Sequence, residues 1–194
     1  FFGYLATITR FPGIALFPAL FVEWWAGKGR KTDLIPLLLI PLGTFSYLFY
    51  VQETTGNWRN FLDSMGVWEQ DRYIFPLQTL FRYIKMFFYM QSYQLVYLIA
   101  LLEILAVLLA IYLVIKGWKL VRRSYLIYVV GYLLIPLSSG TLQGMPRYFL
   151  HTFVLFIIIW KLLRKNKFKI LLMMTMFILQ LFLVVYFSQG YFIS

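Results

Sequence analysis

Charged side chains within or beside apolar segments are the residues of this chain whose positions suggest chemistry. Arg10 lies between Pro- and Gly-containing breaks, Glu103 lies deep in an apolar run, and Arg147 ends a polar stretch. A charge in hydrocarbon is costly unless it is paired or solvated. Because arginine binds phosphate bidentately, Arg10 and Arg147 are candidates for holding a lipid phosphate. The alternatives are arginines that extend to the membrane interface, and for Glu103 a hydrogen bond to a neighbouring helix.

Other titratable residues give weaker signals. His151 follows Arg147 by one helical turn and would add a hydrogen-bond donor, although a lone histidine is more often a structural hydrogen bonder. The acids of one long polar segment are candidates for a general base or cation ligand, but their spacing matches no metal motif, which favours a solvated face. They are Glu53, Asp63, Glu69 and Asp71. The absence of Cys and the single His exclude thiolate catalysis and a multi-His metal site.

The composition indicates a membrane protein. Of the 194 residues, 62% are hydrophobic, 21% are aromatic and only 13% are charged. A soluble domain of this size leaves too much of its surface in water to carry so many apolar side chains. A span needs about 20 residues, so the length allows about six crossings. We therefore expect an all-α, polytopic helix bundle in contact with the lipid bilayer, folded as one domain over residues 1–194.

Basic clusters recur between pairs of apolar segments. Most of the 18 Lys and Arg residues lie in three groups, at 28–31, 116–123 and 161–169. The positive-inside rule places all three in the cytoplasm. Contact with anionic lipid headgroups then explains the net charge of +11. We do not expect nucleic acid as a partner.

The pattern predicts the individual spans. Residues 1–26 form either one kinked span or two short helices that meet at Arg10–Gly13, because Pro12, Gly13 and Pro18 interrupt the run. A polar turn over 138–147 faces outward. The remaining spans are 34–51, 93–115, 124–137, 148–162 and 168–188.

The segment 52–91 is the one long extracytoplasmic loop. Apolar residues from Trp58 to Trp68 and from Leu80 to Phe88 recur at helical spacing, with charged residues between them. Two short amphipathic helices separated by Pro76 fit this pattern, and they would lie flat in the outer interface. They would either contribute to function or only cover the ends of the spans.

Four short segments resemble the PIG-V-type mannosyltransferases, a family of GT-C membrane glycosyltransferases. ATITRFPGIALFPALFVEW, which contains Arg10, resembles the family's TRPTG…LP stretch. Trp68, Arg72 and Pro76 resemble its Trp, Arg and Pro loop, although the family's Arg usually follows its Trp more closely. LLIPLSSGTLQGMPRYFLHTF resembles the LPLSSG…SMPRY signature, and FSQGYFIS resembles the GYW ending, as if the C-terminus were native.

This resemblance implies a function. Such enzymes transfer mannose from a polyprenyl- or dolichyl-phosphate donor to a lipid-linked glycan or another acceptor on the non-cytoplasmic face. Arg147 and Arg10 would bind the donor phosphate. The substrate cavity would be lined by Trp68, Arg72, Ser138, Ser139, Gln143, Tyr148 and His151. The catalytic Asp of the class lies in a first outer loop, which we expect upstream of Phe1 in a longer protein. No cofactor is required, and a divalent cation is compatible with this chemistry.

Two other functions stay open at this stage. A lipid-linked-glycan flippase or transporter would carry polar residues along several spans, whereas only Glu103 is deep in a span here. A non-catalytic membrane scaffold would not need Arg10 or Arg147 near hydrocarbon. The short loops and the absence of an Asn-X-Ser/Thr sequon favour a prokaryotic plasma membrane, with the endoplasmic reticulum as the eukaryotic equivalent.

Overall fold

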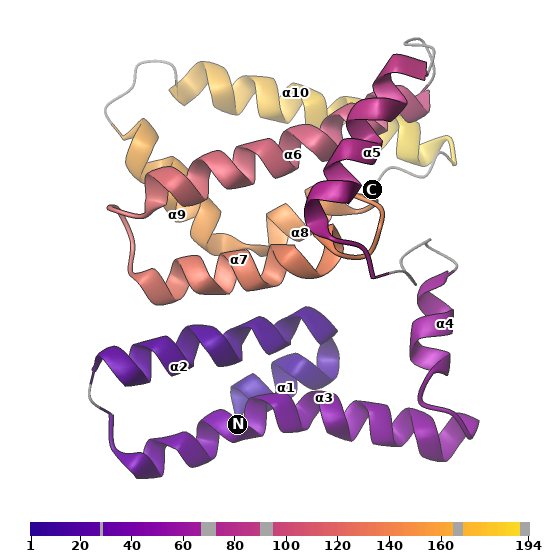
Figure 1. The fold of residues 1–194 in the computed structure, drawn as a ribbon. Helices are drawn as coiled ribbons and strands as arrows, with labels where there is room; N and C mark the ends of the chain where they lie inside the picture. Colours follow the sequence, from indigo (N-terminus) through magenta and orange to yellow (C-terminus); the bar gives the residue numbers. More distant parts are fainter. Residues whose placement is uncertain (28, 67–72, 90–94, 165–168, 191–194) are drawn as a thin grey trace.

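The computed structural model describes residues 1–27, 29–66, 73–89, 95–164 and 169–190. All regular elements in these ranges are helical, which confirms the all-α class (Figure 1). The N-terminal elements are α1 (Phe2–Thr9), η1 (Phe11–Ala15), α2 (Leu16–Ala26), η2 (Lys31–Asp33) and α3 (Leu34–Thr55). Then come α4 (Asn60–Gly66), α5 (Pro76–Tyr89), α6 (Leu95–Gly117), α7 (Arg123–Leu137), α8 (Met145–His151), α9 (Phe153–Leu163) and α10 (Lys169–Ser188).

Several of these helices have the length and composition of membrane spans. Within the described ranges, three single helices qualify, at Lys31–Thr55, Val96–Gly117 and Lys169–Tyr186, and the bent pair α8–α9 makes a fourth if it is one span. The helices Phe11–Ala26 and Arg123–Leu137 are apolar but shorter. The structure thus has three or four helical elements suited to crossing a membrane.

The first apolar segment forms two short helices, which is one of the two arrangements that its sequence allows. Helix α1 ends at Thr9, Arg10 is extended, and η1 turns the chain into α2. The turn needs Gly13, because a Cβ there would lie 2.7 Å from the carbonyl oxygen of Ala6. Arg10 is therefore at the corner between two helices.

The N-terminal helices form a layer with α3. The Thr7 hydroxyl donates to the Ile40 carbonyl of α3 over 2.8 Å, and Gly43 allows close approach because a Cβ there would meet the Thr7 side chain. Small residues at helix contacts are typical of packing in membranes. On its other side this layer contacts α7, where Gly131 faces Ala15. The position of η1, and with it Arg10, is thus fixed against α7.

The second layer contains the main apolar core. Helices α6, α7, α8 and α9 contact one another, and the connection between α7 and α8 contributes Leu142, which is fully buried. The most buried side chains of this core include Val107, Val129, Val154, Leu155 and Ile158. The core therefore holds the 138–144 turn and the start of α8 in place.

The basic connections share one end of the bundle. Figure 1 shows the α2–α3 and α6–α7 connections at one end and the turn before α8 at the other. Arg122 pairs with Glu23 of α2 at 3.2 Å, and the Lys161 ammonium donates to the Leu120 carbonyl over 2.6 Å, so the 116–123 region contacts both α2 and α9. This arrangement agrees with the positive-inside pattern of the sequence.

The structure corrects the predicted span 148–162. The helix already begins at Met145, inside the expected polar turn, and it breaks at Thr152, where α8 and α9 are bent by 76°. The freed carbonyls are satisfied locally, since the Thr152 hydroxyl donates to Tyr148 and the His151 ring contacts the carbonyl of Arg147. A break among apolar helices is tolerated when its backbone groups have such partners.

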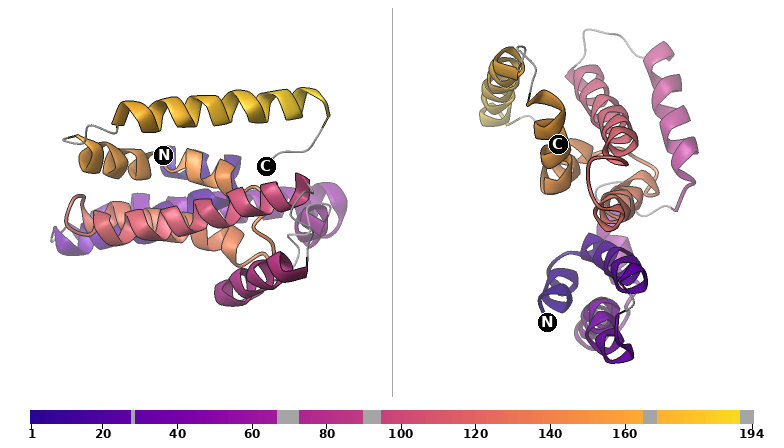
Figure 2. Two further views of the ribbon diagram at one scale, coloured as in Figure 1. Left: turned by 90° about the horizontal axis from the view of Figure 1, so that it is seen from above. Right: turned by 90° about the vertical axis from the view of Figure 1, so that its left-hand side faces the viewer.

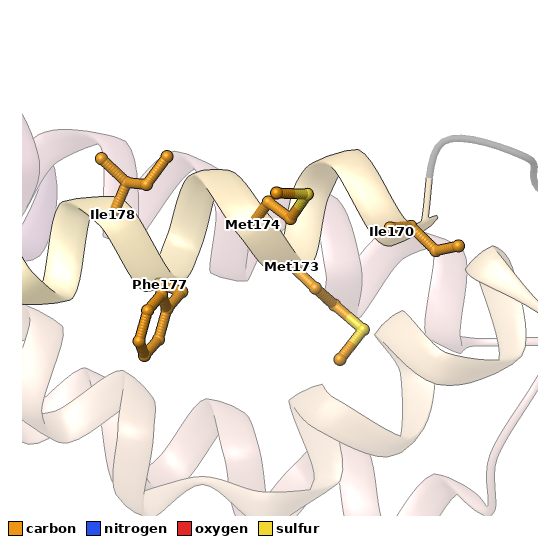
Figure 3. Close-up of a pocket in the computed structure, with 5 residues that line it drawn as sticks. All are labelled: Ile170, Met173, Met174, Phe177 and Ile178. Carbon is orange, nitrogen blue, oxygen red and sulfur yellow. The ribbon is translucent and has the colours of Figure 1, made fainter.

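Helices α5 and α10 lie outside both layers. Helix α5 crosses the direction of the long helices, which Figure 2 shows in the view along their axes, and it contacts α6 and α7. In α10 none of the candidate span is buried. Figure 3 shows its side chains around a shallow hollow, with Met173 and Phe177 on one side and Ile178 on the other. An apolar helix exposed in this way is suited to lipid.

Candidate functional site

The two predicted phosphate-binding arginines come together at one place. Arg10 comes from the corner between α1 and η1, and Arg147 comes from α8. His151 joins them, because its Nε2 lies 3.0 Å from the Arg10 Nη1 and its Nδ1 lies 2.6 Å from the Arg147 carbonyl oxygen. Residues from the two halves of the sequence thus form one basic cluster, which we call the arginine site (Arg10, Arg147, His151, Tyr132 and Tyr148).

The contacts of His151 define its protonation state. A carbonyl oxygen only accepts, so the Nδ1 facing Arg147 carries the proton. The guanidinium of Arg10 only donates, so the Nε2 that it faces accepts. Both contacts are satisfied together by the neutral Nδ1–H tautomer. His151 therefore fixes the direction of the Arg10 side chain without adding a charge.

Two tyrosines complete the arginine site. The hydroxyl of Tyr132, on α7, interacts with the Arg10 guanidinium and lies near Arg147 and Tyr148. The rings of Tyr132 and Tyr148 are 6.0 Å apart in an edge-to-face arrangement. Tyr132 is almost fully buried, whereas Arg10, Arg147 and His151 are exposed. The site therefore has a fixed aromatic base and an open, cationic upper side.

Gly144 shapes the position of Arg147. Its φ of +82° is in the left-handed region that favours glycine, and a Cβ there would lie 3.0 Å from the Arg147 Nη2. The Arg147 side chain thus folds back over Gly144. Gly144 therefore serves both the backbone turn and the room for the Arg147 guanidinium.

The arginine site holds two positive charges without an acidic partner. Among the residues that the structure describes, neither Arg10 nor Arg147 forms an ion pair with a carboxylate. Both guanidinium groups lie near the Tyr132 hydroxyl, and the binding of an anion there would offset their positive charge. The arrangement is suited to binding a phosphate or a similar oxyanion.

The other predicted cavity residues lie close by in the sequence but differ in their contacts. The hydroxyls of Ser138 and Ser139 donate to the carbonyls of Leu134 and Pro136, both over 2.8 Å, so they cap the end of α7. The amide N–H of Gln143 donates to the Thr141 hydroxyl over 3.1 Å. Trp68 and Arg72, as well as the acids Glu69 and Asp71, lie outside the described residues.

Glu103 makes the structural hydrogen bond that the sequence allowed. Its carboxylate is buried and accepts from the Tyr83 hydroxyl of α5 over 2.8 Å. The same hydroxyl accepts from the amide N–H of Leu142 over 3.0 Å. Burial, and then the charge of Glu103, raises the pKa of Tyr83, so the hydroxyl stays protonated and able to donate.

Sequence reasoning missed Tyr83 and Tyr132. The chain has 15 tyrosines, and no motif sets these two apart. Their positions did carry a signal, since Tyr83 is on the same face of its helix as the buried Thr79 and Tyr132 lies one turn before Pro136 in a predicted span. The groups that Tyr83 and Tyr132 contact become clear only from the packing of α5 and η1 against the core.

Two hollows of the structure lie elsewhere. One is the shallow apolar hollow along α10 (Figure 3), and another lies between α1, α2 and α3 near Trp24 and Asp33. Neither is lined by Arg10 or Arg147. The arginine site is thus an open surface, which suits a ligand that approaches from the lipid or from the outer solution. No family model, curated protein or solved structure matches this chain.

Proposed function

We propose that this chain is the donor-binding part of a membrane glycosyltransferase that takes mannose, or a related sugar, from a polyprenyl- or dolichyl-phosphate carrier. The observation that carries the proposal is that Arg10 and Arg147 both contact His151 and that, within the described ranges, neither pairs with a carboxylate. The turn that precedes α8, the helix that carries Arg147, is at the end of the bundle away from the basic connections, where the sequence pattern expects the non-cytoplasmic face (Figure 1). The resemblance of the surrounding motifs to the PIG-V-type family supports the same reading.

The arginine site would contribute donor binding and charge stabilisation to the transfer reaction. An acceptor hydroxyl attacks the anomeric carbon, the bond from that carbon to the phosphate oxygen breaks, and the hydroxyl proton passes to a base. The two guanidinium groups would bind the donor and stabilise the phosphate that leaves. The proposal assigns the arginine site positioning and charge stabilisation, and it assigns the base to none of the residues of this site.

The proposal includes a topology of about six crossings. Helices α3, α6, α7 and α10 and the α8–α9 pair would each cross once, and the α1–α2 pair would form the remaining element. Helices α4 and α5 would lie in the outer interface. The exposed stripe of α5 supports this, with Leu77, Phe81, Ile84 and Phe88 beside Arg82 and Lys85. The membrane would be a prokaryotic plasma membrane, and the acceptor a lipid-linked glycan.

The test is sugar transfer by arginine variants of the full-length protein. Membranes are supplied with a radiolabelled polyprenyl-phosphate mannose, and the label in the extracted lipid-linked glycan is counted. Arg147→Ala is expected to abolish transfer, and Arg147→Lys to lose most of it, because lysine does not make a bidentate contact. Arg123→Ala, at the basic end, serves as the matched control and should transfer normally.

Two results would count against the proposal. Sugar transfer by Arg147→Ala at the wild-type rate would show that the donor phosphate does not bind at this site. A wild-type protein that moves lipid-linked glycans between leaflets without forming a glycosidic bond would favour the transporter alternative instead.

A further inference from the structure

We propose that Tyr83 is a positioning residue that holds the arginine-bearing turn in its phosphate-binding arrangement. The proposal rests on the proposed function, because it assigns the purpose of the contact to donor binding. It extends the site from α8 to α5, a helix that has no residue in the arginine site itself.

The geometry makes Tyr83 a junction of three segments. Its hydroxyl donates to the buried Glu103 of α6 over 2.8 Å and accepts from the Leu142 N–H over 3.0 Å. The Thr141 hydroxyl is 3.3 Å away and itself accepts from the Gln143 N–H. A single oxygen thus links α5, α6 and the turn, and both of its hydrogen-bonding roles are used.

The turn needs such an anchor because its backbone is interrupted by glycines. Gly140 and Gly144, with φ of 90° and 82°, flank the segment that Tyr83 holds. Arg147 follows Gly144 by one helical turn, so a shift of the turn moves its guanidinium. A second contact from the same side supports this anchor, since the Ile74 N–H donates to the Ser138 carbonyl over 2.8 Å. The segment leading into α5 and α5 itself therefore hold the turn at two points.

Glu103 fixes the direction of the Tyr83 hydroxyl. Because the carboxylate takes the single phenolic proton, a lone pair of the oxygen is left to face Leu142. Without the carboxylate the hydroxyl proton would be free to rotate toward the turn, where it opposes the Leu142 N–H. The buried charge thus acts through Tyr83 on the turn.

The test compares variants of the full chain in lipid nanodiscs with a radiolabelled long-chain prenyl phosphate as the probe. Tyr83→Phe removes the hydroxyl, and Glu103→Leu removes the acceptor. Glu103→Gln keeps an acceptor oxygen and is the conservative variant. Tyr97→Phe is the matched control, since the Tyr97 ring packs on Phe87 and its hydroxyl has no hydrogen bond within the described ranges. Dissociation constants and amide hydrogen exchange of the 138–147 peptide are measured for each.

We expect Tyr83→Phe and Glu103→Leu to raise the dissociation constant about tenfold, as for one lost hydrogen bond, and to speed exchange of the peptide. Glu103→Gln and Tyr97→Phe should stay within about threefold of wild type. An unchanged rate of amide hydrogen exchange in Tyr83→Phe would overturn the anchoring role, whether or not the dissociation constant of the prenyl phosphate changes. Faster exchange with unchanged affinity would overturn the link to the arginines. A wild type that does not bind the probe would overturn the proposed function, and this extension with it.

Discussion

The two ends of the helix bundle use the same side chains in opposite ways. At the basic end Arg122 pairs with Glu23, Arg123 lies over the Trp118 ring and Arg164 lies over the Trp160 ring. At the other end Arg10 and Arg147 meet His151 and Tyr132 and have no carboxylate among the described residues. Cations at the first end lie on interface aromatics, as expected beside cytoplasmic headgroups.

This difference distinguishes cations that bear on membrane topology from cations that are candidates for ligand binding. The basic end is crowded with charges, so the loss of one changes little. The arginine site has few charges: the Arg10 side chain is directed by hydrogen bonds to His151 and Tyr132, and the Arg147 side chain lies over Gly144. The number of cations is therefore evidence on topology, whereas the partners of each cation show whether it is already occupied by another side chain.

The largest expected effect is the loss of both site arginines. In the pair Arg10→Ala and Arg147→Ala, donor affinity should fall by about a hundredfold or more, since each guanidinium makes charge-assisted hydrogen bonds. The single variants should lose nearly as much as the double, because both arginines would bind one anion and act as a unit. Binding of a radiolabelled prenyl phosphate in nanodiscs measures this.

The control pair is Arg122→Ala with Arg123→Ala, which removes the same charge from the basic end. If the control weakens binding as much as the site pair, net charge rather than geometry governs the affinity, and the two ends do not differ as described.

Gly144→Ala should have the next largest effect. A residue with a Cβ in the left-handed region costs about 1–2 kcal/mol, and here the Cβ would also displace the Arg147 side chain. Gly56→Ala is a matched control, because Gly56 has a φ of 77° and open space around it. Both variants should unfold at lower temperature, but only Gly144→Ala should bind the prenyl phosphate more weakly. Equal affinities would show that Arg147 adapts.

Sequence patterns predicted the helices better than their contacts. The expected spans 34–51, 93–115, 124–137 and 168–188 match α3, α6, α7 and α10 to within a few residues, because apolar runs end at polar or glycine-containing breaks. The break at Thr152 was not predicted. No Pro or Gly marks it, and the side-chain hydrogen bonds of His151 and Thr152 that satisfy it depend on the folded chain.

The sequence pointed to Arg10, Arg147, Tyr148 and His151 as single residues, but neither to Tyr132 nor to their arrangement. Arg10 and Arg147 stood out because each is a charge beside an apolar run. That they share His151 depends on η1 packing against α7, where Ala15 meets Gly131. The partner of Glu103 was equally hidden, because one tyrosine in a long loop has no local signal for a contact with α6.

His151 offers a smaller and more selective effect. His151→Gln places an acceptor near the Nε2 position that faces Arg10, whereas His151→Asn places a donor near the Nδ1 position that faces the Arg147 carbonyl. We expect affinity to fall by about threefold in His151→Gln and about tenfold in His151→Asn, because only the first keeps Arg10 in place. A larger loss of affinity in His151→Gln than in His151→Asn would mean that His151 maintains the end of α8 rather than the direction of the Arg10 side chain.

The smallest effect is expected at the Glu23–Arg122 ion pair. Both side chains are exposed, at 47% and 73%, so the pair contributes little through Coulomb attraction in water. Glu23→Gln should change the free energy of unfolding by about 0.5 kcal/mol and leave prenyl phosphate binding unchanged. Unfolding in detergent at low and high salt measures this, since screening should remove the difference between variant and wild type. A loss of prenyl phosphate binding in Glu23→Gln would show that the basic end and the arginine site are energetically coupled, which contradicts the difference described between the two ends.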